Sequence, residues 1–357
     1  MSTLVNPNLP LKGRGTPLNP VNRFEPLTID VDPDWLDYAE EKPVPTTYYV
    51  DTTRTILSKN DSPDIPFTHG LNPYRGCEHG CIYCYARPTH EYYGLSSGLD
   101  FETKIMVKLE APKLLEETFR APKWQPQVIA LSGNTDCYQL AERKLQITRR
   151  CLEVFLKYRN PVGMITKNAL IVRDLDLLRQ LAADNLVTVS VSITTLDNQL
   201  CRKLEPRTSA PEKRLEAIEK LAAAGIPTGV NVAPVIPGLT DHEMPAILAA
   251  AAAGGASRAG FIMLRLPHAV KELFSTWLQQ HYPDRANKVM HAIQEMRDGH
   301  LNDPRFGSRF RGEGERVEAI QQLFEMTCKK LGLNEKRGHL TARHFRRSEQ
   351  GDLFESK

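Results

Sequence analysis

The chain has 357 residues, of which 41% are hydrophobic, and carries a formal net charge of +3. This length and apolar content suffice for one large domain or two ordinary ones, and so small a net charge does not by itself indicate nucleic-acid binding. No run of about 18 apolar residues occurs and the start lacks the pattern of a signal peptide, so we expect a cytoplasmic protein without membrane association.

The first 65 residues are rich in proline and polar residues and show little periodicity beyond the run TTYYVDTTRTIL at 46–57. This composition predicts an extended N-terminal arm. Three aromatic residues, Trp35, Tyr38 and Tyr48, offer the arm apolar anchors. We therefore expect it to wrap partly around the domain that follows.

Residues 66–267 alternate between short β-rich runs and amphipathic segments, which is typical of repeated βα units in a parallel sheet. The predicted strands are 104–108, 127–132, 162–166, 186–194, 228–236 and 259–266. The predicted helices between them are 142–158, 173–184 and 211–225. About six such units predict an α/β fold with a partial (β/α)6 TIM-type barrel, whose chemistry lies at the carboxyl ends of the strands.

Polar residues follow several of these strands, as in SGNTDCYQ (132–139), TKN (166–168) and RLP (265–267). In the strand at 186–194 the apolar and the hydroxyl side chains fall on opposite faces, because strand side chains alternate. The hydroxyl face carries Thr188, Ser190, Ser192 and Thr194. A strand flanked by helices is not expected to expose a polar face, so these hydroxyls are predicted to line a ligand cavity.

Residues 268–357 are predicted to form a helical extension that ends in a basic tail, with helix patterns at 285–297 and 314–332. The tail interleaves cationic and aromatic side chains: Lys336, Arg337, His339, Arg343, His344, Phe345, Arg346 and Arg347. This pattern suits contact with the phosphates of a nucleic acid. The alternative is a solvated tail without a partner.

Three of the seven cysteines cluster in the segment GCEHGCIYC, at Cys77, Cys81 and Cys84. An odd number of cysteines without any sign of export favours metal or redox use over disulfides. Three thiolates can hold three irons of a cubane cluster and leave the fourth iron open to a ligand. The alternative is a zinc ion with His79 or His90 as fourth ligand, but the remaining cysteines are scattered and supply no second pair.

The segment CEHGCIYC matches the CxxxCxxC motif of radical S-adenosylmethionine (SAM) enzymes. Together with the flanking LNPYRG and YARPTHEY, and with SGNTDCYQ and VAPVIPGLTDHE, it resembles the spore photoproduct lyase-like branch of that superfamily over about residues 55–347. The resemblance implies a 4Fe-4S cluster whose open iron binds SAM, and reductive cleavage of SAM to methionine and a 5′-deoxyadenosyl radical that abstracts hydrogen. It also implies a reductant such as flavodoxin or ferredoxin as partner.

The resemblance assigns roles to individual residues. Cys77, Cys81 and Cys84 would ligate the cluster, and Tyr83 occupies the aromatic position whose backbone meets the adenine of SAM. The family's Gly-Gly-Glu position, which accepts the SAM amino group, corresponds to Ser132, Gly133 and Asn134. Serine replaces the first glycine and no glutamate follows, so a hydroxyl and backbone carbonyls are expected to take over the contact.

Further contacts to SAM are implied by the same resemblance. Ser190 and Ser192 lie where contacts to the ribose and carboxylate are expected, and Lys167 and Arg207 are candidates for the carboxylate. The stretch VAPVIPGLTDHE resembles the apolar strand that packs on adenine. The residues nearest the adenine would then be Val232 and Pro234.

Cys137 lies just past a strand end and is a candidate donor of a hydrogen atom to a product radical, because a thiol S–H bond is weaker than most C–H bonds. Spore photoproduct lyase is thought to use a cysteine at a comparable strand tip in this way. The neighbouring Tyr138 is a candidate radical relay. The alternative is a small buried apolar filler, which is how free cysteines usually behave.

The resemblance points to DNA as substrate, and Arg265, Arg202 and Lys203 are positioned in the sequence to reach a phosphate from the barrel mouth. A base in duplex DNA would have to be flipped out of the stack. The terminal stretch QGDLF, Gln350 to Phe354, is similar to the pentapeptide by which bacterial repair enzymes bind the sliding clamp. It is a candidate peptide for that partner.

Three functions therefore stay open at this point. The first is a radical SAM enzyme, a lyase or base-modifying enzyme, that acts on nucleic acid, for instance in DNA repair. The second is a radical SAM enzyme that modifies a protein or a small molecule. The third is a zinc-containing nucleic-acid-binding module, against which the series of βα units argues.

Overall fold

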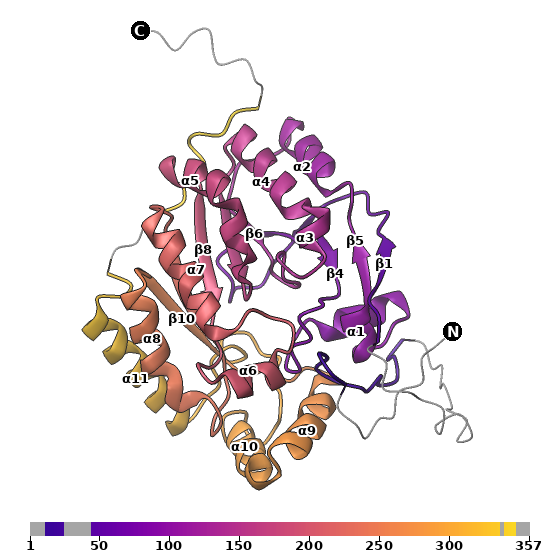
Figure 1. Cartoon of the computed structure of the whole chain (residues 1–357), viewed down its shortest axis with the longest axis vertical. Helices are drawn as coiled ribbons and strands as arrows, with labels where there is room; N and C mark the ends of the chain where they lie inside the picture. Colours follow the sequence, from indigo (N-terminus) through magenta and orange to yellow (C-terminus); the bar gives the residue numbers. More distant parts are fainter. Residues whose placement is uncertain (1–10, 25–43, 336–338, 348–357) are drawn as a thin grey trace.

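The computed structural model of the chain describes residues 11–24, 44–335 and 339–347. Its main feature is a seven-stranded sheet in the order β10-β9-β8-β7-β6-β3-β2 (Figure 1). All neighbours in this sheet are parallel except β2 (Leu57–Lys59), which pairs antiparallel with β3 (His69–Leu71). The other strands are β6 (Ile129–Leu131), β7 (Val162–Thr166), β8 (Val187–Ser192), β9 (Thr228–Val235) and β10 (Arg258–Met263).

Six parallel strands confirm the partial (β/α)6 barrel, but its first strand differs from the prediction. The run at 104–108 forms β5 (Lys104–Val107), which lies in a separate small sheet between β1 (Thr47–Val50) and β4 (Tyr74–Arg75). The first barrel strand is β3, which precedes the cysteines. Its three residues, His-Gly-Leu, are too few to show an alternating pattern, so no periodicity predicts this strand.

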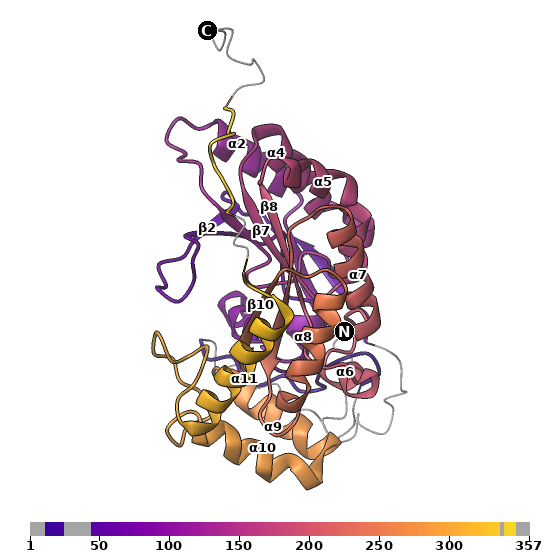
Figure 2. The same cartoon turned by 90° about the vertical axis from the view of Figure 1, so that its left-hand side faces the viewer.

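Helices follow the parallel strands and cover one face of the sheet, as α4, α5, α7 and α8 show in Figure 2. These four span Ile147–Tyr158, Leu175–Ala183, Pro211–Ala223 and Met244–Ala253. The predicted helix at 142–158 is divided into α3 (Glu142–Leu145) and α4, because Gln146 has a left-handed backbone with φ of 50°. The remaining helices are α1 (Leu99–Thr103), α2 (Ala111–Arg120), α6 (Asn198–Leu204), α9 (Val270–His281), α10 (Pro283–Glu295) and α11 (Glu315–Leu331). Short 3-10 turns lie at Arg87–Tyr93, Ala169–Asp174 and Asp241–Glu243.

The core lies between the sheet and these helices. The apolar residues of β8, Val187, Val189 and Val191, are completely buried there together with leucines of α5 and α7. On the opposite face Thr188 and Ser190 are only half-buried, and Ile165 of β7 is 38% exposed. The predicted alternation is confirmed at Thr188 and Ser190, whereas Ser192 and Thr194, further along the same face, are buried. A ligand cavity on this face stays a prediction.

The C-terminal part confirms the predicted helices and adds α9. Helix α11 packs on α8, and the segment 339–347 crosses the amino ends of the strands (Figure 2). There the amide of Thr341 donates to the Asn185 carbonyl at 3.2 Å, and the amide of Arg346 donates to the Tyr158 carbonyl at 2.9 Å. Phe345 meets the ring of Phe119 edge-on. The described part of the tail is therefore fixed at the end of the barrel opposite to the cysteines.

Among the described residues, no helix combines the length and the apolar character needed to cross a bilayer.

Candidate active site

The three clustered cysteines lie in one loop that begins after β4, at the carboxyl end of the first barrel strand. Gly76 and Gly80 have φ of 77° and 67°, so the loop turns twice through left-handed backbone, which glycine adopts without strain. The amide of Cys77 donates to the Phe101 carbonyl at 2.9 Å, and the amide of Cys84 donates to the Cys81 carbonyl at 3.2 Å. Cys77 and Cys81 are buried and Cys84 is half-buried.

The completely buried guanidinium of Arg87 supports this loop through hydrogen bonds to its backbone. Its Nε donates to the Cys81 carbonyl at 3.0 Å and its Nη2 to the Gly80 carbonyl at 3.3 Å. Its Nη2 also pairs with the buried carboxylate of Glu102 at 2.5 Å. Because each of these groups is buried, the guanidinium fixes the backbone around the second cysteine through charge-assisted hydrogen bonds.

The two histidines proposed as a fourth zinc ligand are already engaged. The ring of His79 lies 3.5 Å from Asp136 through Nδ1 and 3.2 Å from the Asn168 amide through Nε2, and His90 Nε2 lies 2.9 Å from the Lys104 carbonyl. Burial lowers the pKa of both rings, that of His90 to about 4, and Asp136 opposes the shift at His79. Both ring nitrogens of His79 are thus engaged, whereas His90 Nδ1 is buried and has no hydrogen-bond partner among the described residues.

The donor set fits an iron–sulfur cluster better than a single ion. In the described residues no three His, Cys, Asp or Glu side chains are arranged so that they could share one metal ion. Zinc requires its ligands to converge on one point, whereas each thiolate of a cubane binds a different iron. Burial raises the pKa of all three thiols above the usual value for cysteine.

Tyr83, between the second and third cysteines, is hydrogen-bonded to a buried carboxylate. Its hydroxyl donates to Glu205, whose carboxylate also accepts from Thr194 Oγ1 at 2.6 Å and pairs with the buried guanidinium of Arg214. Burial alone would raise the pKa of Glu205, but Arg214 and Lys167 outweigh it and hold that pKa well below its usual range. Sequence reasoning missed Glu205 and Arg214, because neither belongs to the cysteine motif.

Lys167 lies at the carboxyl end of β7, as the prediction for the SAM carboxylate requires. Its Nζ donates to the Ala233 carbonyl at 2.7 Å and lies 3.4 Å from Glu205. The ammonium also lies 5.7 Å from the centre of the Tyr83 ring. The lysine is therefore placed between the cysteine loop and the strand ends, with 17% of its side chain exposed.

The loop after β6 carries the three residues predicted for the SAM amino group. Ser132 has a left-handed backbone with φ of 78°, and its hydroxyl donates to the Thr135 carbonyl at 2.7 Å and accepts from the Cys137 amide at 3.1 Å. A methyl group on Gly133 would meet no atom within 4 Å, so the loop borders open space. The hydroxyl of Tyr85, which follows Cys84 directly, donates to the Gly133 carbonyl. This contact joins the cysteine loop to the loop after β6.

The residues predicted on β8 and β9 differ in their burial and in the face of the sheet that they occupy. Ser190 and Ser192 share one face by alternation, but Ser190 is half-buried, whereas Ser192 is buried and its carbonyl accepts from Arg214 at 3.0 Å. Val232 belongs to the core between sheet and helices, so the expectation that it packs on adenine is corrected. Alternation places Asn231 and Ala233, both half-buried, on the opposite face of β9, and Pro234 follows a cis peptide bond and is buried.

Arg207, the second candidate for the SAM carboxylate, contacts the N-terminal arm and the cysteine loop. Its Nη1 lies 3.9 Å from the Glu78 carboxylate and donates to Thr46 Oγ1 at 3.4 Å. Its role toward the SAM carboxylate stays a prediction. Tyr48, expected as an anchor of the arm, donates from its hydroxyl to Glu78 at 2.9 Å, and Trp35 and Tyr38 lie outside the described residues.

Cys137 and Tyr138 are both completely buried in the core. Burial raises the pKa of the Cys137 thiol well above its usual value, with further contributions from Asp136 and Glu142. The hydroxyl of Tyr138 donates to Asp174 at 3.0 Å. Both residues directly follow the Ser132 loop, and their roles as hydrogen donor and relay stay predictions.

Arg265, at the carboxyl end of β10, combines a charge with two aromatic neighbours. Its guanidinium carbon lies 5.7 Å from the centre of the Tyr85 ring and 4.8 Å from that of Phe310. Its Nε is buried and has no hydrogen-bond partner among the described residues. Burial, followed by the nearby Arg309, lowers its pKa. An unpaired guanidinium in such a place is suited to an anionic group of a ligand.

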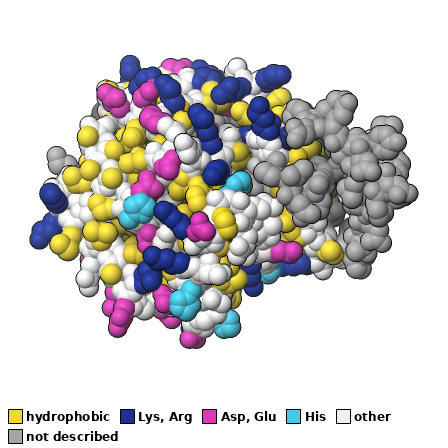
Figure 3. All heavy atoms as spheres, turned by 60° about the horizontal axis from the view of Figure 1, so that its bottom comes forward, with side chains coloured by type: hydrophobic (Ala, Val, Ile, Leu, Met, Phe, Trp, Pro, Cys, Tyr) yellow, Lys and Arg dark blue, Asp and Glu magenta, His cyan; other side chains and the backbone are white. Residues whose placement is uncertain are grey.

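Arg202 and Lys203 lie on the surface of α6, where the Lys203 ammonium is 4.7 Å from the centre of the Tyr282 ring. Among the described residues no contact joins Arg202 or Lys203 to Arg265. On the face formed by α6, α9 and α10, Lys and Arg side chains alternate with acidic and apolar ones (Figure 3). This face forms no continuous basic patch.

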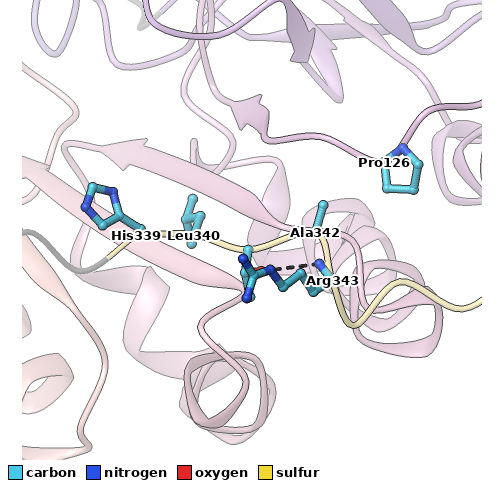
Figure 4. A pocket seen from close by; sticks show the side chains of 6 residues that line it. Pro126, His339, Leu340, Ala342 and Arg343 are labelled. Carbon is cyan, nitrogen blue, oxygen red and sulfur yellow. Dashed lines mark hydrogen bonds between the residues drawn. The ribbon is translucent and has the colours of Figure 1, made fainter.

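The described tail residues border a cavity of about 680 Å³ at the amino end of the barrel. Figure 4 shows His339, Leu340, Ala342 and Arg343 along the C-terminal segment and Pro126 from the loop before β6. Lys336, Arg337 and the stretch from Gln350 to Phe354 lie outside the described residues. Because residues 339–343 line it, the cavity lies at the end of the barrel opposite to the cysteine loop.

Several known proteins resemble the chain in sequence. An uncharacterized protein of Mycobacterium tuberculosis is 36% identical over 226 residues, which cover 63% of this chain and 66% of that protein. An uncharacterized protein of Methanocaldococcus jannaschii is 30% identical over 173 residues, covering 48% of this chain and 62% of the archaeal one. The chain thus spans slightly less than two thirds of the length of these curated relatives.

Solved structures resemble the chain in fold. The spore photoproduct lyase complexed with dinucleoside spore photoproduct superposes with a TM-score of 0.58 at 18% identity, over 80% of each chain. The family model described as Radical SAM superfamily matches residues 71–251, which include the cysteine loop, the Ser132 loop, the last residue of β3 and the four barrel strands from β6 to β9. With this match the zinc-module hypothesis is discarded, and the chain belongs to the radical SAM superfamily, as an enzyme with a spore photoproduct lyase-like fold.

Proposed function

We propose that Cys77, Cys81 and Cys84 hold a 4Fe-4S cluster, that SAM binds at the carboxyl ends of the barrel strands, and that the enzyme acts on nucleic acid. The observation that carries the proposal is the placement of three cysteines in one braced loop, which faces the Gly133 loop through Tyr85. The bound cluster and SAM would supply one-electron reduction and a 5′-deoxyadenosyl radical.

The residues of the chain would bind and orient these groups. Gly133 borders open space, so the carbonyls of its loop would accept from the SAM amino group. The Ser132 hydroxyl, which already donates to the Thr135 carbonyl and accepts from the Cys137 amide, would be a further acceptor. Lys167 would reach the SAM carboxylate by leaving its 2.7 Å bond to the Ala233 carbonyl. Ser190, on the half-buried face of β8, would contact the ribose. Glu205 keeps Tyr83 in place and balances the Lys167 charge.

The proposal of a nucleic-acid substrate depends on two basic features. Among the described residues Arg265 has no carboxylate within ion-pair distance, and the rings of Tyr85 and Phe310 beside it suit a nucleobase stacked near a phosphate. The tail residues Arg343, Arg346 and Arg347 add positive charge at the other end of the barrel. We propose that this tail contacts the nucleic acid away from the reacting nucleotide.

The second candidate, a radical SAM enzyme that modifies a protein or small molecule, is favoured by the mixed charge of the face formed by α6, α9 and α10 (Figure 3). A face of mixed charge suits a protein substrate better than a polyanion. Binding of a sliding clamp through Gln350 to Phe354 stays a proposal on the sequence alone.

Anaerobic reconstitution with iron, sulfide, SAM and dithionite tests the chemistry through the release of 5′-deoxyadenosine. Binding of single-stranded and duplex oligonucleotides at increasing salt tests the substrate class, because phosphate contacts make affinity fall steeply with salt. Arg265→Gln should weaken binding and leave 5′-deoxyadenosine release without substrate unchanged. Affinity that does not depend on salt would reject nucleic acid in favour of the second candidate.

A further inference from the structure

Residues 11–24, here called the strap, lie along the cysteine loop although they are about 60 residues away in the sequence. Arg14, Gly15 and Thr16 of the strap are buried. Arg23 lies near the C-terminal end of the strap. Arg23 pairs with Glu91 at 2.5 Å, just beyond the last cysteine. The cysteine loop is thus enclosed between the barrel and the strap.

The strap meets the loop through one buried carboxylate, that of Glu102. One carboxylate oxygen accepts from the Gly15 amide at 2.9 Å, and the other accepts from Arg87 at 2.5 Å. The carbonyl of Glu102 accepts from Arg14 Nη1 at 2.9 Å. Since Arg87 in turn binds the Cys81 carbonyl, a continuous chain of hydrogen bonds runs from the strap to the second cysteine.

The packing at this contact leaves no room for side chains. A Cβ atom on Gly15 would overlap the carbonyl oxygen of Gly80, which lies between the first two cysteines. A Cβ atom on Gly98 would overlap the Leu18 carbonyl, which accepts from the Leu99 amide at 2.8 Å. Two backbone-to-backbone contacts therefore fix the position of the strap on the loop.

We propose that the docked strap is part of the cluster site: it holds the cysteine loop in the geometry that retains the cluster and shields that loop from solvent. Three thiolates must be kept in place together, and a loop without outside support would lose ligands by local opening. Docking of the strap and binding of the cluster are then linked, so that each stabilises the other by the same free energy. This inference rests on the proposed function in one respect, that the loop holds a cluster.

The mutational test uses Gly15→Ala, which adds one methyl group at the tight contact. Gly254→Ala, at the end of α8, is the matched control, because its Cβ would meet nothing nearer than 3.5 Å. Both proteins are reconstituted anaerobically, and loss of the visible absorbance and of protein-bound iron is followed after addition of a chelator. We expect Gly15→Ala to lose iron at least tenfold faster than the wild type, which corresponds to about 1.4 kcal/mol, and Gly254→Ala to match the wild type. Equal rates in all three proteins would overturn the inference.

The reciprocal test uses the unaltered protein and decides the question if Gly15→Ala does not fold. Hydrogen exchange of the Gly15 and Leu99 amides should slow when the cluster is loaded, whereas the Val189 amide in the sheet should not change. Exchange at the strap that is the same with and without the cluster rejects the linkage. If the wild type takes up no cluster at all, the proposed function fails instead, so the two failures are distinguishable.

Discussion

The substitution Glu205→Gln should destabilise the protein strongly although it keeps the shape of the side chain. Glu205 and Arg214 are both completely buried, with 0% and 1% of their side chains exposed. The amide would leave the Arg214 guanidinium without a counter-charge in the interior, with only neutral partners such as the carbonyls of Ser209 and Ser192. Removal of one partner from a buried ion pair costs about 3–5 kcal/mol.

This cost is a large share of the total stability expected for a folded chain, about 5–15 kcal/mol. The assay is urea unfolding of the cluster-free protein in reducing buffer, compared with Glu216→Gln. Glu216 pairs with Lys213 on the exposed surface of α7, so its substitution should leave the urea midpoint unchanged. A loss smaller than about 1 kcal/mol for Glu205→Gln would show that the carboxylate does not balance Arg214, and the reasoning would be refuted.

Three further predictions concern the site. Replacement of Cys77, Cys81 and Cys84 together by alanine should abolish iron uptake without unfolding the protein, as measured by bound iron and circular dichroism. Cys137→Ala should preserve SAM cleavage but change the substrate-derived products by mass spectrometry; identical products would remove Cys137 from the mechanism. The pKa of Glu205 is lower in the folded than in the unfolded protein, so its ionised carboxylate stabilises the fold above about pH 4.3, and this stabilisation is lost as the pH falls. The free energy of unfolding of Glu205→Gln should therefore lack this dependence on pH.

The barrel was predictable because its strands are long enough to alternate. On β8, three buried valines and the half-buried Thr188 and Ser190 follow the pattern of the sequence. The same alternation explains the error at Val232, since the resemblance identified the strand but not which of its faces meets the cavity. The first strand, β3, has only three residues and carried no pattern.

The cysteine triplet was predictable from spacing, whereas its support was not. Glu102 and Glu205 are distant from the cysteines in the sequence, and only the folded structure brings their charges to the loop. Arg87 follows Cys84 by three residues, but its burial behind the loop could not be read from the sequence. A single charged residue in a sequence gives no sign of being buried. Tyr85 is different, because it directly follows Cys84 and its place in the motif could have singled it out.

The sheet has two free edges in the described structure, at β10 and at β2, and the cylinder is therefore not closed. A closed cylinder admits a reactant only along its axis, which suits small molecules. In this chain the segment 307–310 lies between the two edges: the Met263 amide of β10 donates to the Phe310 carbonyl at 2.9 Å, and Arg309 pairs with Asp64 of the β2–β3 turn at 2.5 Å. The wall of the barrel is therefore completed on this side by loop and side-chain contacts and not by strand pairing.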